Sequence, residues 1–172
     1  MVKRGLLTAL ALASGVAAGA AQAEVGEPTD EALKEKVRAL WQAQQQALDA
    51  HDIAGVMDTF ADTDDIMLMG TGPGEHWVGR EEIRDAYAHF MEGFDPHTKK
   101  ITCGEGAGTS RGSVVWLTGV CDFTDKKGDE PRHFILNISA VLVEQGDAWR
   151  FHTMHFSHLM GGDGQQSQDA SE

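Results

Sequence analysis

The sequence predicts an α+β protein in which helices are segregated onto one face of a curved antiparallel sheet. Two observations carry this prediction. Between residues 30 and 94 the apolar residues recur mainly at helical spacing, whereas after Pro96 their period changes to two. The segments with a period of two are separated by "TSRG", "DKKGDEP" and "EQGDA", which are typical turn sequences. The chain shows no internal repeat.

Three helices are expected in the first half of the domain. The first begins after Pro28, where Thr29 supplies a cap and two acidic residues fill the first turn, and it runs to about residue 50. A second, shorter helix starts at His51 and has apolar residues on one side. The third runs over about 80–94, and Pro96 stops it because proline cannot continue a helix.

Six strands are expected from the remaining apolar segments. Two are short, at 66–69 and 77–78, and lie between the second and third helices. Four longer strands follow at about 98–107, 113–124, 132–144 and 149–159. Apart from Ala170, the residues after Met160 are glycine or polar, so we expect a disordered tail over 161–172.

The start of the chain is typical of a secretory signal peptide. Residues 1–4 are basic, residues 5–20 are small and apolar, and Ala21-Gln22-Ala23 offers the pattern that signal peptidase cleaves. We therefore expect a periplasmic or secreted protein whose mature form begins near Glu24. An uncleaved amphipathic helix is the alternative, although the segment has no polar face.

The net charge of the chain argues against two classes of binding partner. The formal net charge is −13, and removal of Lys3 and Arg4 with the leader would bring it to −15. Because such a surface repels nucleic acid and anionic lipid, we expect neither as a partner. No second long apolar run follows the leader, so no membrane span is expected either.

The two cysteines are expected to form one disulfide. Cys103 and Cys121 each lie nine residues from Gly112, which sits in a turn-rich stretch. A hairpin that folds near Gly112 would place them nearly opposite each other on neighbouring strands, and an exported protein meets an oxidising compartment. Two buried free thiols are the alternative.

The glycine-rich stretch "GTGPGEHW" favours a wide hairpin turn between the two short strands. It lacks the glycine spacing of a dinucleotide fingerprint, and no phosphate-binding lysine motif follows it, so we expect no cofactor. The histidines of "FHTMHFSHL" also predict no metal site. His152 and His158 would point to one face of a strand and His155 to the other.

Two segments resemble a known family. "GTGPGEHWVGREEI", together with "WRFHTMHFS" on the last expected strand, resembles the SnoaL-like branch of the nuclear transport factor 2-like superfamily. The resemblance implies a cone-shaped curved sheet wrapped around the three helices. With the signal peptide expected over 1–23 from the leader, the SnoaL-like domain is expected over 24–160. This fold hosts ketosteroid isomerases, polyketide cyclases, dehydratases and the association domain of a calcium/calmodulin-dependent kinase, so it does not by itself choose a function.

The residues within the expected cone predict an apolar cavity. Steroid isomerases of this fold use a tyrosine on a pocket strand, whereas the only tyrosine of this chain, Tyr87, falls on an expected helix. The kinase association domain lines its cavity with arginines, and Val120, Ala140 and Phe156 stand at those positions here. We expect the cavity to bind a small hydrophobic molecule. The expected lining consists of Met69, Trp77, Tyr87, Trp116, Val120, Leu136, Ile138 and Phe156.

Two other functions remain open. The first is acid/base catalysis on a carbonyl compound, of the isomerase or dehydratase type, with Asp122 and His155 as catalytic residues. It requires the face of Trp116 and Val120 to point inward; otherwise Asp122 is an exposed residue that opens a turn. The second is an assembly module without a ligand.

A homodimer is also expected, because the strand over 113–124 is apolar on both faces. One face can be covered by the helices, and an exposed apolar face of a sheet usually marks an interface. The resemblance implies back-to-back pairing through that surface. If the odd-numbered face is the outer one, Leu117→Lys would split the pair.

Overall fold

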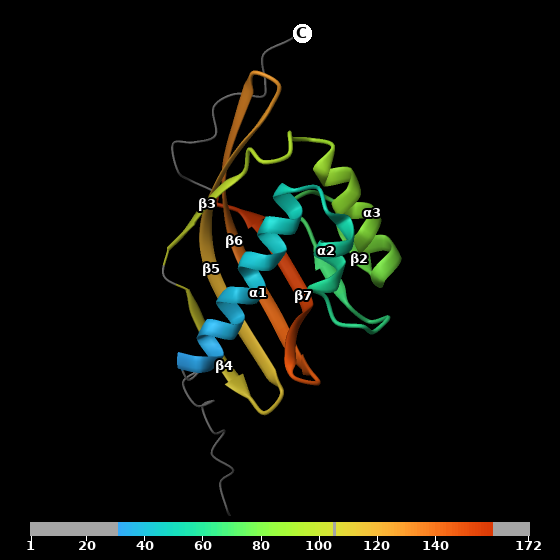
Figure 1. Cartoon of the computed structure of the whole chain (residues 1–172), viewed down its shortest axis with the longest axis vertical. Coiled ribbons are helices and arrows are strands. Elements are labelled where there is room, and N and C mark those ends of the chain that lie inside the picture. Colours follow the sequence, from blue (N-terminus) through green and yellow to red (C-terminus); the bar gives the residue numbers. More distant parts are fainter. Residues whose placement is uncertain (1–30, 105, 160–172) are drawn as a thin grey trace, which may run out of the picture.

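The computed structural model describes residues 31–104 and 106–159 (Figure 1). The helices are α1 (Glu31–Asp49), α2 (Ile53–Asp58) and α3 (Arg80–Met91). The strands are β1 (Met67–Met69), β2 (His76–Val78), β3 (Lys100–Cys103), β4 (Ala107–Arg111), β5 (Val114–Lys127), β6 (Glu130–Gln145) and β7 (Ala148–His158). The expected signal peptide and tail lie outside the described residues, so export stays a prediction. Within the described ranges, no helix is both long and apolar enough to cross a membrane.

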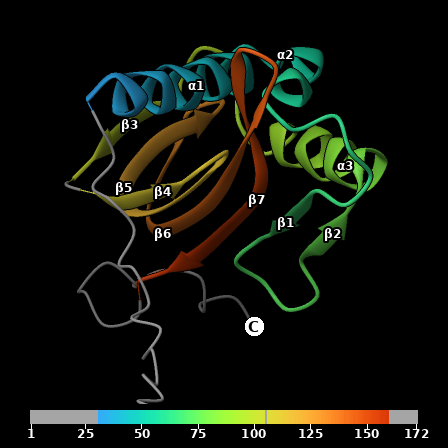
Figure 2. The ribbon, with the colours of Figure 1, turned by 90° about the horizontal axis from the view of Figure 1, so that it is seen from below.

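The predicted fold class is confirmed. In the described part of the chain, seven strands form one curved, open sheet in the order β2-β1-β7-β6-β5-β3, with β4 also paired to β5. Figure 2 shows the three helices on one side of this sheet. All neighbouring strands are antiparallel except β1 and β7, which are parallel. The single strand expected at 98–107 is wrong in detail, because β3 and β4 are separate strands on the same side of β5.

Helix α3 is anchored at its first turn. Its N-cap is Gly79, which adopts a positive φ of 87° and has no side chain to cap the helix. The Glu82 carboxylate instead accepts a hydrogen bond from the backbone N–H of Val78 at 2.9 Å. The Arg80 guanidinium donates to the carbonyl oxygens of Ala61 and Met57, at 2.9 and 3.2 Å. These contacts join α3 to the end of α2 and orient the helix that forms one wall of the cavity.

The inner face of the sheet follows the alternation of β6. Leu136, Ile138, Ala140 and Leu142 are all buried, as the sequence predicts. On β5 the odd-numbered residues point inward, and Val115 and Phe123 are each only 2% exposed. Trp116 and Val120 are 42% and 41% exposed, so the even-numbered face is the outer one.

This assignment changes how the homodimer is tested. Leu117 packs against the core, so Leu117→Lys would disturb folding rather than pairing. The homodimer stays a prediction, now through the outer face that carries Trp116, Val120 and Ile135. Trp116→Lys should then turn a dimeric mass into a monomeric one in light scattering, because it places a charge in the expected interface. A wild type that is already monomeric would contradict the dimer.

The structure contains the predicted disulfide between Cys103 and Cys121, which stand directly opposite each other on β3 and β5. The hairpin of β4 and β5 pairs Ala107 with Thr118. Continued without change, that register would place Cys103 opposite Asp122. The pairing shifts by one residue between β4 and β3, and this shift brings the two cysteines together.

Candidate functional site

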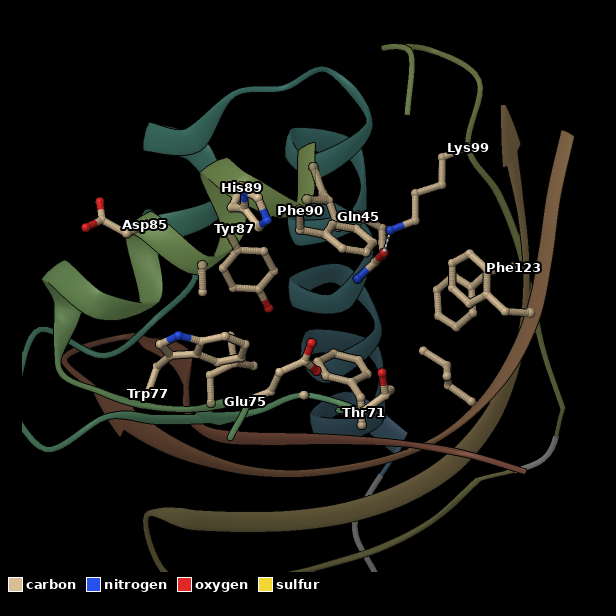
Figure 3. A pocket seen from close by; sticks show the side chains of 17 residues that line it. Gln45, Thr71, Glu75, Trp77, Asp85, Tyr87, His89, Phe90, Lys99 and Phe123 are labelled. Atoms are coloured by element: carbon tan, nitrogen blue, oxygen red, sulfur yellow. Dashed lines mark hydrogen bonds between the residues drawn. The ribbon is translucent and has the colours of Figure 1, made fainter. Parts of the chain in front are cut away.

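A cavity of about 550 Å³ lies between the inner face of the sheet and the helices (Figure 3). Its walls come from α1, α3, the inward residues of β5, β6 and β7, and the β1–β2 hairpin. Most of the lining is aliphatic or aromatic. The apolar residues are Leu48, Leu68, Trp77, Ala86, Tyr87, Phe90, Phe123, Phe134, Leu136 and Phe156.

Two phenylalanines form a flat wall at one end of the cavity. Phe123 of β5 and Phe134 of β6 are directly paired across the sheet. Their rings are stacked, with centroids 5.3 Å apart and planes 9° apart. Such pairs add to the stability of neighbouring strands, so this end of the cavity has a preformed aromatic surface.

Lys99 places an amine beside this aromatic surface. Its backbone N–H donates to Asp49 Oδ1 at 2.8 Å, which holds the segment before β3 against the end of α1. Its Nζ donates to Gln45 Oε1 at 3.0 Å. The Nζ also lies 5.6 Å from the ring centroid of Phe90 and 5.3 Å from that of Phe123.

The environment of Lys99 changes its titration. Burial lowers the pKa of Lys99 to about 8, because removal from water disfavours the charged amine. The carboxylates of Asp125 and Asp49 act in the opposite direction, and the nearby Arg132 guanidinium lowers the pKa further. Lys99 therefore titrates much closer to neutral pH than a solvated lysine does.

The glycine-rich hairpin places a carboxylate in the cavity. The Glu75 side chain folds back over the loop, and its Oε2 accepts a hydrogen bond from the backbone N–H of Gly72 at 2.7 Å. A Cβ at Gly70 would lie 2.2 Å from Glu75 Oε2, and one at Gly72 would lie 3.0 Å from Glu75 Cδ. The two glycines thus leave the space that the glutamate occupies, and Figure 3 shows its carboxylate among the cavity side chains.

Tyr87 contributes a hydroxyl from α3. The residue is 6% exposed, and its hydroxyl donates to the thioether sulfur of Met154 at 3.8 Å, which is a weak bond. Burial raises the pKa of Tyr87, so the phenol stays protonated and can donate a hydrogen bond to a ligand. The cavity therefore offers a phenol donor, a carboxylate and an amine within mainly apolar walls.

Four of the predicted lining residues do line this cavity: Trp77, Tyr87, Leu136 and Phe156. Ile138 faces inward but lines a separate hollow beside Trp41 of α1. Met69, Trp116 and Val120 are exposed and line no part of the cavity. The error on β5 has one cause, which is that its even-numbered residues point away from the helices.

The two predicted catalytic residues lie outside the cavity. Asp122 is on the outer face of β5, where both its carboxylate oxygens lie within 3.1 Å of His133 Nε2. His155 directly precedes Phe156 on β7, and neighbouring residues of a strand point to opposite faces. Because Phe156 lines the cavity, His155 is turned to the outer side, where its Nδ1 lies 3.4 Å from Ser139 Oγ.

Sequence reasoning missed Gln45, Glu75 and Lys99. Glu75 had a detectable signal, since a carboxylate that directly follows a cluster of glycines is a candidate for a side chain that needs free space. Lys99 had no such signal in the sequence, because its neighbour Lys100 has the same side chain and is exposed. Only the fold separates the two lysines.

The geometry agrees with comparisons to known proteins. Residues 37–161 match the SnoaL-like domain family. A search of curated proteins finds no match. Solved structures with the same fold include a putative dehydratase from the NTF2-like family of Streptomyces avermitilis, with a TM-score of 0.65 and 16% identity over 74% of this chain and 96% of that one.

Two further solved structures are similar. An NTF2-like protein from Pseudomonas putida KT2440 has a TM-score of 0.64 and 17% identity, over 83% of this chain and 99% of that one. A putative calcium/calmodulin dependent protein kinase II association domain from Xanthomonas campestris has a TM-score of 0.64 and 20% identity, over 77% and 90%. At these identities the likeness concerns the fold alone. The family match spans most of the chain, so this chain belongs to the SnoaL-like domain family.

Proposed function

We propose that this domain binds a small hydrophobic molecule in the cavity between its sheet and its helices. The observation that carries the proposal is the cavity itself, which has a volume of about 550 Å³ and mainly apolar walls. Ligand sites are typically apolar clefts of roughly 300–1,000 Å³ with a few polar groups that orient the ligand. Glu75, Tyr87 and Lys99 are polar groups of this kind.

The proposal is tested by filling the cavity. Ala86 is half-buried on the cavity side of α3, so Ala86→Trp should occupy the space that a ligand needs. Nile red, an uncharged dye that fluoresces in apolar surroundings, should bind the wild type and lose at least about tenfold in affinity in this variant, since the buried dye area is lost. Fluorescence titration measures both.

Ala88→Trp provides the matched control. Ala88 is exposed on the same helix, so the same substitution there should leave dye binding unchanged. Circular dichroism shows whether both variants keep their helices. Equal dye binding by the wild type, Ala86→Trp and Ala88→Trp would mean that the dye binds elsewhere, and would contradict the proposal.

Acid/base catalysis is a second candidate, and the observation that favours it is the Glu75 carboxylate in the same cavity as the Tyr87 hydroxyl. Glu75 replaces Asp122 as the candidate base, and Tyr87 would donate to the oxygen of a bound carbonyl compound. Glu75→Gln should then remove turnover of such a compound without weakening its binding. Unchanged turnover in this variant would leave binding as the function.

A further inference from the structure

Among the described residues, Lys99 is a mostly buried cation that forms no ion pair. An ammonium group has three N–H donors. Within residues 31–104 and 106–159, the hydrogen-bond acceptor of Lys99 Nζ is the neutral amide oxygen of Gln45. The rings of Phe90, Phe94 and Phe123 also lie around this amine, with centroids 5.3 to 5.9 Å from Nζ. Aromatic faces attract a cation but accept no conventional hydrogen bond.

The carboxylates near Lys99 are engaged elsewhere. Asp49 accepts the backbone N–H of Lys99 rather than its ammonium. Asp125 accepts two hydrogen bonds from Arg132, at 2.6 and 2.8 Å. In the described part of the chain, no carboxylate lies within ion-pair distance of Lys99 Nζ. A charge in mainly apolar surroundings is costly unless it is paired, so a ligand that supplies the missing anion gains by doing so.

The Glu75 carboxylate would orient such a ligand in the cavity. Glu75 lies on the β1–β2 hairpin, and Figure 3 shows Lys99 and Trp77 on opposite sides of the cavity. An anion near Glu75 would be repelled, whereas an anion near Lys99 would be attracted. An elongated ligand should therefore place its anionic end at Lys99 and its apolar end toward Trp77.

We propose that the Lys99 end of the cavity binds the carboxylate of an amphipathic ligand of the fatty-acid class, whose chain fills the apolar part. This proposal rests on the proposed function and specifies the class of its ligand. Lys99 supplies the charge, Gln45 holds the amine in place, and the apolar walls of β6 and β7 bind the chain.

Decanoate and decanol separate the two parts of this proposal, because they share the chain and differ in the charged end. Each is used to displace Nile red from the full domain at pH 7.5. Lys99→Met should weaken decanoate binding by roughly tenfold or more, since a charge-assisted hydrogen bond is lost, and should change decanol binding by less than about twofold. Lys100→Met, at the exposed neighbour, should change neither.

The pH dependence gives an independent readout. Above about pH 8 the Lys99 amine loses its charge, so decanoate binding to the wild type should fall by roughly tenfold between pH 7.5 and 9.5. The other charged or titratable groups around Lys99 and the cavity include the carboxylates of Asp49, Asp125 and Glu75, the Arg132 guanidinium and the His89 imidazole. Lys99→Arg keeps its charge throughout, so it should hold decanoate equally at both pH values.

Three outcomes decide the proposal. Equal decanoate binding by the wild type and a folded Lys99→Met would overturn it. If decanol displaces the dye from the wild type, but decanoate binds the wild type no more tightly than it binds Lys99→Met, the proposed function stands and this inference falls. If neither compound displaces the dye from the wild type, both fall. The Lys99→Arg variant keeps the test valid should Lys99→Met fail to fold.

Discussion

Arg132→Met should lower the free energy of unfolding by about 3–5 kcal/mol. Asp125 is 4% exposed on the inner face of β5, and Arg132 Nε and Nη2 donate to its two carboxylate oxygens. Removal of the guanidinium would leave a buried carboxylate without its hydrogen-bonded charge partner. Urea denaturation of the variant and the wild type measures the loss.

Two controls separate the buried pair from an ordinary surface contact. Asp125→Leu/Arg132→Met removes both charges, so it should recover much of the loss, because apolar residues often replace a buried ion pair at little cost. Lys127 is half-exposed, and its Nζ lies 3.7 Å from Asp95 Oδ1. Lys127→Met should therefore lower the free energy of unfolding by less than about 1 kcal/mol. A cost below about 1 kcal/mol for Arg132→Met would contradict the role that we give to the pair.

Cys103→Ser/Cys121→Ser should lower the free energy of unfolding by about 3 kcal/mol, because the bond closes a loop between residues 18 positions apart and so restricts the unfolded chain. Thermal melting of the double variant against the oxidised wild type measures the effect. The melting temperature of the wild type in reductant should match that of the double variant, and reductant should not change the melting temperature of the double variant. A reductant-insensitive wild type with the melting temperature of the double variant would show that the bond does not form in solution.

The helices could be predicted because each has a single apolar face, and β6 because its inner face is apolar without interruption. Leu136, Ile138, Ala140 and Leu142 form this face, whereas Asn137 and Ser139 interrupt the opposite one, so the pattern favours burial of the even-numbered residues. Strand β5 carries apolar residues on both faces, and its own pattern does not choose between them. Its orientation is set by the register with β6, in which Lys127 pairs with Glu130 across a two-residue turn. A sequence reading that fixed the length of this turn would have placed Cys121 and Phe123 inside and Asp122 outside.

The polar part of the site was beyond such reasoning for a different reason. Glu75 and Lys99 stand in connecting segments without a periodic pattern, and their side chains are directed by single hydrogen bonds to distant or irregular backbone and side-chain groups. Gln45 and Lys99 contact each other although they are more than fifty residues apart in the sequence. Local pattern carries no information about such contacts, so the apolar walls were foreseeable and the charged groups were not.

The parallel pairing of β1 with β7 has a consequence for how the chain folds. Met67 pairs with Thr153, and Phe60 bridges to Phe151, so the early part of the domain finds its partner only in the last strand. Pairings between segments that are far apart along the chain slow folding, because the loop between them must be closed before the contacts form. A hairpin of two three-residue strands is marginal in water by itself. The hairpin that carries Glu75 should therefore become ordered only after β7 has docked, and the binding cavity should be among the last parts of the molecule to form during refolding.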